Sequence, residues 1–131
     1  MVQIRRYIAL VGLLLSLTLS PGCGGKGEVR VSAGDNGSQV TLEVGQTLVL
    51  SLESNPTTGY EWEIAEIDEA ILKETHHEYK ADWPVLIGSG GRDIWHFRAE
   101  AEGRTTLTLN YRRSWEKAEP IQTFSVEVVV H

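Results

Sequence analysis

The chain has 131 residues, a length that corresponds to one domain rather than two. Its 18 acidic residues outnumber its 12 basic ones, and the resulting net charge of −6 is poorly suited to binding nucleic acid or an anionic lipid surface. A single cysteine excludes an intramolecular disulfide. The fold must therefore be held together by burial of a hydrophobic core, which is feasible for a domain of this size.

The start of the chain differs in kind from the rest. Two arginines precede a largely apolar stretch, 8–19, which is too short to span a bilayer permanently and is typical of a secretory signal. Cys23 follows a small residue, and this context is similar to the cleavage site of bacterial lipoproteins, although Ser20 stands where that pattern prefers leucine. We expect 1–22 to be a signal peptide and 23–27 to be a lipidated cysteine with a flexible tether. Ordinary cleavage nearby, leaving a free thiol, is the alternative.

Signal cleavage would leave 109 residues with a net charge of −8, because the segment removed holds two arginines and no acidic residue. We expect this mature chain to be exported and to stay at the cell envelope, in the periplasm or on the outer surface. Any membrane attachment would come from acyl chains on Cys23 and not from a basic patch.

From residue 28 to 131 the chain alternates apolar and polar side chains with the period of two that is typical of β-strands. The runs recur at the spacing of a β-sandwich, with turn residues between them. The residues expected to face the core are Val29 and Val31; Val40, Leu42 and Val44; Leu48, Leu50 and Leu52; Tyr60, Trp62 and Ile64; Trp95, Phe97, Ala99 and Ala101; Leu107, Leu109 and Tyr111; Phe124, Val126, Val128 and Val130. The pattern predicts an all-β sandwich of about seven or eight strands.

Two segments do not follow this alternation. Residues 66–72 fit either a helical turn or part of a strand, whereas 73–79 are expected to form a strand. Residues 81–92 contain Pro84 and three glycines and show no periodicity, so we expect them to form a long loop. A long loop in a compact domain commonly carries function.

A proline and a glycine punctuate the segment NPTTGY, which lies between two alternating runs. Its residues are Asn55, Pro56, Thr57, Thr58, Gly59 and Tyr60. Pro56 restricts the residue before it to extended geometry, and Gly59 can adopt a positive φ that other residues resist. Thr57 and Thr58 would then stand at the tip of a turn, with hydroxyl groups that can donate or accept hydrogen bonds. Such a turn alone is a plain connection, but the longer pattern NPTTGY-x-W is much more specific.

A second notable segment has very little side chain. It consists of Gly88, Ser89, Gly90 and Gly91. Backbone of this kind can approach another surface closely and offer its N–H and C=O groups for pairing. A phosphate-binding loop is excluded, because no Lys-Ser/Thr pair and no helix follow. A flexible hairpin connection remains the alternative.

The third segment reads RRSWE and covers residues 112–116. Trp115 stands in polar surroundings, so we expect its side chain to be exposed. An exposed tryptophan beside an arginine, here Arg113, is typical of a hot spot in a protein–protein contact. The alternative is a tryptophan that folds back onto the edge of a sheet.

Taken in order, the three segments resemble those of the chagasin-like inhibitors of papain-family cysteine peptidases, peptidase inhibitor family I42. The resemblance runs from about residue 40 to the end of the chain. It implies an immunoglobulin-like sandwich in which three loops at one end form a wedge that plugs the cleft of the peptidase. The protein would then be a monomeric, reversible and non-covalent inhibitor, not an enzyme, and it would need no cofactor.

The resemblance also implies roles for the first two loops. In this family the loop equivalent to 55–60 enters the catalytic centre, so Thr57 and Thr58 would lie closest to the cysteine and histidine of the peptidase. The glycine-rich loop, 88–91, would lie along the non-primed side of the cleft.

The third loop departs from the family pattern. The usual form is Arg-Pro-Trp; Arg113 and Trp115 match it, but Ser114 replaces the proline. Proline reduces the entropy lost on ordering, typically by ~0.4–1 kcal/mol. We therefore expect a looser loop over 112–116 and a lower affinity.

Other functions compete with this hypothesis. An exported binding module for an envelope protein or a carbohydrate is the alternative, since Trp83 and Trp115 would lie outside the core. The neighbours His76 and His77 point to opposite faces of a strand and do not form a metal site. Ser89 lacks the strand–turn–helix context of a catalytic nucleophile.

Overall fold

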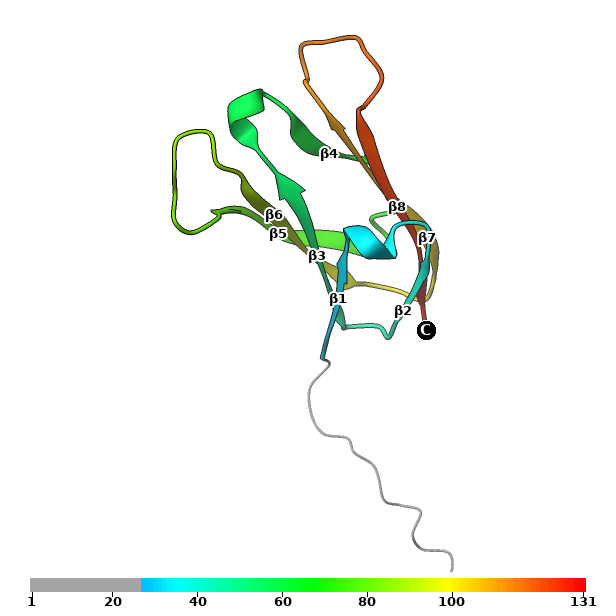
Figure 1. The fold of residues 1–131 in the computed structure, drawn as a ribbon. Coiled ribbons are helices and arrows are strands. Elements are labelled where there is room, and N and C mark those ends of the chain that lie inside the picture. Colours follow the sequence, from blue (N-terminus) through cyan, green and yellow to red (C-terminus); the bar gives the residue numbers. More distant parts are fainter. Residues whose placement is uncertain (1–26) are drawn as a thin grey trace, which may run out of the picture.

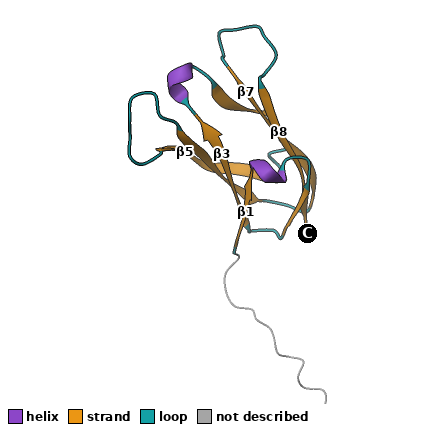
Figure 2. Ribbon diagram, in the orientation of Figure 1, coloured by secondary structure: helices purple, strands orange, loops and turns teal. Residues whose placement is uncertain are grey.

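The computed structural model describes residues 27–131, so the expected signal peptide, Cys23 and most of the tether lie outside the described residues. The described chain forms two four-stranded sheets (Figure 1). Apart from two short 3₁₀ turns it contains only strands and loops (Figure 2). No helix within residues 27–131 is long and apolar enough to cross a membrane. The prediction of an all-β sandwich of seven or eight strands is confirmed.

The elements follow one another at short intervals along the chain. They are β1 (Glu28–Ser32), η2 (Ala33–Asp35), β2 (Gln39–Leu42), β3 (Thr47–Ser54), η3 (Pro56–Thr58), β4 (Glu61–Glu66), β5 (Leu72–Ala81), β6 (Gly91–Ala99), β7 (Gly103–Arg112) and β8 (Gln122–Val130). One sheet has the strand order β1-β3-β6-β5 and the other has the order β2-β8-β7-β4. The chain therefore changes sheet at every connection except β5–β6 and β7–β8, and the edge strands are β1, β5, β2 and β4.

Strand direction decides where the loops lie. β1 runs parallel to β3 and β2 runs parallel to β8, whereas every other pair of neighbouring strands is antiparallel. Consequently β3, β5 and β7 end where β4, β6 and β8 begin, and their connections emerge together (Figure 1). β1 starts at the opposite end of the sandwich.

The core lies between the sheets and is built from the alternating apolar positions. Trp62 and Trp95 are 8% and 2% exposed, which confirms the prediction that both face the core. Phe97, Leu107 and Leu109 are fully buried among them. Each such side chain contributes about 1.5–3 kcal/mol when it leaves water. The chain has one cysteine and so cannot form an intramolecular disulfide. Burial of the core therefore stabilises the fold without one.

Two residues of the predicted core rows are instead exposed. β2 ends at Leu42 and β6 ends at Ala99, so Val44 and Ala101 lie in turns beyond the strands. Alternation predicts burial only while the backbone stays extended and covered by the facing sheet.

The two segments without alternation adopt different structures. Residues 67–71 form a turn, and β5 then runs on to Ala81. The expected loop over 81–92 is shorter at both ends, because Ala81 and Gly91 pair with each other in the sheet. A Cβ at Gly91 would lie 2.2 Å from the carbonyl oxygen of Lys80, so glycine permits this close pairing.

Candidate functional site

Three loops leave the same end of the sandwich (Figure 1). We call them loop 1 (55–60, between β3 and β4), loop 2 (82–90, between β5 and β6) and loop 3 (113–121, between β7 and β8). The strands that carry them are paired right up to the loops, as with Ser54 opposite Gly91 and Glu61 opposite Arg112. The sheets therefore hold the bases of all three loops in place, and the predicted gathering of the three segments at one end is confirmed.

Loop 1 is a capped 3₁₀ turn. The Asn55 side chain accepts hydrogen bonds from the backbone N–H of Thr57 at 3.2 Å and from its hydroxyl group at 2.6 Å. The Thr58 hydroxyl donates to the Asn55 carbonyl at 2.7 Å. Gly59 then ends the turn with a φ of 85°, the positive value expected from the sequence. Both threonines are exposed, and their hydroxyl protons are used inside the loop.

Asn55 also joins loop 1 to its surroundings. Its backbone N–H donates to the hydroxyl group of Tyr111 on β7 at 3.0 Å. Its side-chain amide donates to the carbonyl oxygen of Gly88 in loop 2 at 3.1 Å. One residue thus caps the turn, ties it to the opposite sheet and fixes the neighbouring loop.

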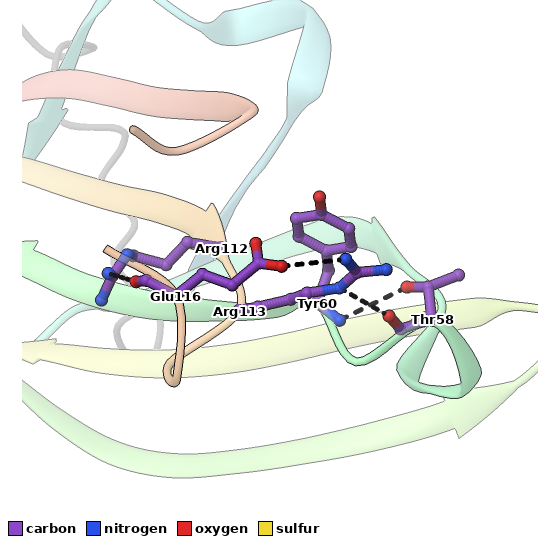
Figure 3. A network of polar contacts seen from close by, with 5 residues as sticks. All are labelled: Thr58, Tyr60, Arg112, Arg113 and Glu116. Atoms are coloured by element: carbon purple, nitrogen blue, oxygen red, sulfur yellow. Dashed lines mark hydrogen bonds and ion pairs between the residues drawn. The ribbon is translucent and has the colours of Figure 1, made fainter. Parts of the chain in front are cut away.

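Loop 3 begins with a four-residue turn, 113–116, closed by a hydrogen bond from the Glu116 N–H to the Arg113 carbonyl at 3.1 Å. Two arginines hold this turn (Figure 3). Arg112 donates to the Glu116 carbonyl at 2.7 Å, and the Arg113 guanidinium contacts the Glu116 carboxylate at 3.2 Å. Glu116 is therefore held by both its backbone and its side chain.

Arg113 reaches across from loop 3 to loop 1. Its Nε donates to the carbonyl oxygen of Thr58 at 3.0 Å (Figure 3). Its guanidinium carbon lies 4.4 Å from the centre of the Tyr60 ring, within the range of a cation–π contact. Tyr60 in turn stacks on Tyr111, which contacts Trp62 in the core. An aromatic column therefore supports both loops from below.

Trp115 is 67% exposed, as the sequence predicts. One part of its ring rests on loop 1, since a Cβ at Gly59 would lie 2.5 Å from its Cη2 atom. Glycine at this position allows the backbone to turn with positive φ and also allows the indole to approach. Trp115 thus presents a large apolar surface to solvent on a defined support.

Loop 2 carries the most exposed apolar side chains at this end. Trp83 is 89% exposed and Ile87 is fully exposed, with Val85 and Leu86 also exposed. A turn at its tip is closed by the Ser89 hydroxyl, which donates to the Leu86 carbonyl at 2.8 Å. Apolar side chains gathered in this way on a protein surface are typical of a contact surface.

The glycines of loop 2 have different surroundings. Gly88 has a φ of 79°, and a Cβ at this position would meet no other atom within 4 Å, so the glycine serves the turn itself. A Cβ at Gly90 would lie 3.0 Å from the Ser54 carbonyl, which shows how closely the loop approaches β3. Gly91 is buried at the start of β6. The predicted contact residue Gly91 therefore belongs to the base of loop 2 and not to its surface.

Below loops 1 and 3 a cleft of about 320 Å³ opens between the edge strands β4 and β5. Its floor includes His77, whose Nε2 lies 2.9 Å from an Asp93 carboxylate oxygen and whose ring stacks on Trp95. Desolvation raises the pKa of the Tyr79 phenol in this cleft, and the carboxylates of Asp82 and Asp93 raise it further. The Tyr79 phenol therefore stays protonated to a higher pH than a free tyrosine.

The side chains at this end of the sandwich suit binding to another protein. Within residues 27–131 no group of three His, Cys, Asp or Glu side chains could hold a metal ion. The loops instead combine fixed polar turns with exposed apolar rings, which suits a contact with another protein.

Several residues of this site gain their role only from the structure. Glu116 is not distinguished by the sequence, because nothing in a local pattern shows that two arginines converge on it. Val85, Leu86 and Ile87 belong simply to the long loop expected over 81–92. A signal for them is nevertheless present, since three consecutive apolar residues after a proline are unusual in an exposed segment.

Comparison with known proteins relates this geometry to a family. A family model described as "Chagasin family peptidase inhibitor I42" matches residues 41–128, more than half of the chain. Amoebiasin-1 of Entamoeba histolytica is 32% identical over 98 residues, which cover 73% of this chain and 93% of that protein. Chagasin of Trypanosoma cruzi is 30% identical over 90 residues, which cover 66% of this chain and 82% of that protein.

The fold has a solved counterpart as well. The crystal structure of EhICP2, a cysteine protease inhibitor from Entamoeba histolytica, matches with a TM-score of 0.75 and 22% identity. The match covers 83% of this chain and all of that one. At this level of identity the likeness shows the fold.

Proposed function

The chain belongs to the chagasin family of peptidase inhibitors, and we propose that it blocks papain-family cysteine peptidases by reversible, non-covalent occlusion of the active-site cleft. In this proposal the contact surface is the end of the sandwich that carries loops 1, 2 and 3. Loop 1 enters the cleft, loop 2 lies along its non-primed side and loop 3 lies on the other flank.

The observation that carries this proposal is the way in which the three loops are joined. Asn55 bonds loop 1 to loop 2, and Arg113 bonds loop 1 to loop 3. A surface that is already ordered loses little conformational entropy when it binds. The three loops can therefore dock as one wedge and keep most of the interaction free energy as affinity.

The shape of loop 1 explains how an inhibitor could avoid cleavage. A peptidase of this class needs an extended segment across its catalytic residues, whereas Pro56–Thr58 is a 3₁₀ turn. The hydrogen bonds that Asn55 accepts from Thr57 and Thr58 would all have to break before the segment could extend. Thr57 and Thr58 would therefore occupy the catalytic centre without presenting a scissile bond.

The exposed aromatic rings would supply much of the binding free energy. Trp115 in loop 3 and Trp83 in loop 2 lie on loops to either side of loop 1 and are largely exposed in the free chain. Large aromatic side chains that become buried in a contact are the usual hot spots. Ser89 and Gly90 would add backbone pairing along loop 2.

The test is inhibition of papain by residues 28–131, a segment that contains both sheets and the whole core. We expect wild-type protein to inhibit hydrolysis of a small fluorogenic peptide at micromolar concentration or below. Trp115→Ala should weaken the inhibition constant by about 1–3 kcal/mol. Glu43→Ala, in the turn at the opposite end, should change nothing. Absence of inhibition of any papain-like enzyme at micromolar concentration would disprove the proposal and favour another binding module.

We also propose that the mature chain is an exported, monomeric lipoprotein whose Cys23 carries the acyl chains. The position of β1 supports this arrangement, because Glu28 lies at the end of the sandwich opposite the loops (Figure 1). Attachment through the N-terminal side would leave the loop end facing the aqueous compartment. Mass spectrometry of the mature N-terminus tests the proposal: an unmodified Cys23, or cleavage at another position, would contradict it.

A further inference from the structure

Loop 3 contains a turn that its backbone alone restrains weakly. The hydrogen bond from Glu116 N–H to the Arg113 carbonyl makes Ser114 the second residue of a four-residue turn. This is the position where proline would preset φ, and serine does not. Trp115, the next residue, is 67% exposed and gives the turn little support from the core. Other contacts must therefore hold the indole in place.

Those contacts converge on Glu116. Arg112, on β7, donates to its carbonyl oxygen at 2.7 Å and also lies 3.5 Å from Glu63 on β4. Arg113 contacts its carboxylate at 3.2 Å. The far end of the turn is thus fixed to two paired strands.

The same Arg113 is already engaged with loop 1. Its Nε donates to the Thr58 carbonyl at 3.0 Å, and its guanidinium lies over the Tyr60 ring. The Glu116 carboxylate orients the guanidinium from the other side (Figure 3). The charged group thus has partners on three sides, all of them within the inhibitor.

We propose that Arg113 and Glu116 are positioning residues for inhibition, which hold loops 1 and 3 in one arrangement before the peptidase arrives. The ion pair between these two side chains restrains the turn at Ser114, as the ring of a proline at this position would. The inference rests on the proposed function, but it concerns how the wedge is held and not what it binds.

A direct contact of Arg113 or Glu116 with the peptidase predicts different effects of mutation from those of a positioning role. If Arg113 or Glu116 acted mainly by touching the peptidase, stiffening the turn would help equally whether or not Glu116 is present. If Glu116 acts by ordering the turn, proline should help chiefly when Glu116 is missing. Arg113→Lys separates charge from geometry, because lysine keeps the charge but lacks the Nε donor and the planar group.

The first experiment is a double-mutant cycle on the inhibition constant against papain, with Glu116→Ala and Ser114→Pro alone and together. We expect Glu116→Ala to raise the constant about 3- to 10-fold, the effect of one extra side chain to be ordered on binding. Ser114→Pro should change it less than about 2-fold alone, and should recover about 2- to 5-fold in the Glu116→Ala background. An equal effect of Ser114→Pro in both backgrounds would overturn the inference.

The second experiment needs no peptidase. Hydrogen exchange of the Thr58 and Gly59 amides, which donate within loop 1, reports how firmly the loop is held. Arg113→Lys should speed their exchange about 3- to 10-fold while circular dichroism stays unchanged. Unchanged exchange would overturn the inference.

Glu127→Ala is the matched control for both experiments. Glu127 accepts a hydrogen bond from Thr106 and pairs with Arg104 on the same sheet, away from the loops. Its removal should alter neither the inhibition constant nor the exchange of loop 1. If the wild-type chain inhibits no papain-like enzyme, the proposed function fails, and the exchange measurement still decides whether Arg113 holds loop 1.

Discussion

Loop 1 and loop 2 leave the same end of the sandwich, and each turns at a glycine with positive φ, yet their construction is opposite. Loop 1 is held on both sides, by Tyr111 and Arg113, and its tip carries two small polar residues. Loop 2 has one polar link to its neighbour, through Asn55, and its tip carries four exposed apolar residues.

The difference shows how one binding surface can combine a rigid loop with a large exposed apolar area. Loop 1 has little apolar surface to contribute, so its value lies in a fixed shape that fits a narrow cleft. Loop 2 has a large apolar surface, which contributes free energy in proportion to the area removed from water. A rigid tip needs support from the fold, whereas an apolar tip needs only to reach its partner.

The largest expected effect tests the support beneath loop 1. Trp62 donates to the Glu53 carbonyl and contacts Tyr111, which receives a hydrogen bond from Asn55. Trp62→Ala should lower the free energy of unfolding by about 3–5 kcal/mol, as large-to-small core substitutions do. Chemical denaturation measures this change. A negligible shift of the midpoint would contradict the placement of Trp62 in the core.

Thr58→Arg should have the largest effect on inhibition itself. Thr58 is exposed at the tip of loop 1, so the substitution should leave the fold intact. A charged side chain forced into the cleft would clash and lose its hydration, which should weaken inhibition by about 3 kcal/mol or more. The inhibition constant against papain gives the answer, with circular dichroism as the check of folding. Full inhibition by the variant would contradict the proposal that loop 1 enters the cleft.

A pair of glycine substitutions compares the two loops directly. Gly59→Ala and Gly88→Ala each place a Cβ at positive φ, at a cost of about 1–2 kcal/mol. Only Gly59→Ala also pushes against Trp115, so it should weaken inhibition about 10-fold more than Gly88→Ala. Inhibition constants and thermal midpoints of both variants are the measurements. Equal loss of inhibition would show that Trp115 does not depend on loop 1.

The smallest effect is expected from Trp83→Ala in loop 2. Because Trp83 is 89% exposed, its removal should leave the thermal midpoint unchanged. Inhibition should weaken by about 1 kcal/mol, since the indole would be buried only in the complex. Thermal unfolding and the inhibition constant together make the distinction. A stability loss without a change in inhibition would place Trp83 in the fold and not in the contact.

Much of the scaffold could be predicted from local sequence. Alternation with a period of two identified every strand except β5, because side chains on an extended chain point to opposite faces whatever the strand pairs with. β5 begins at Leu72, a core residue that none of the alternating rows contained. Asn55, Pro56 and Gly59 likewise predicted a turn, since their backbone preferences act within a few residues. The errors came at strand ends, where Val44 and Ala101 continue the alternation but no sheet covers them.

The sequence by itself determined the strands, the turns and the position of the three loop segments along the chain, because those properties depend on neighbouring residues. Only the tertiary structure decided that Gly91 is buried, that Trp115 rests on Gly59, and that Arg113 joins Glu116 to the Thr58 carbonyl. The contacts of Trp115 with Gly59 and of Arg113 with Thr58 link residues 56 and 55 positions apart. They exist because two sheets bring the ends of their strands together, and no local pattern of residues encodes that distance.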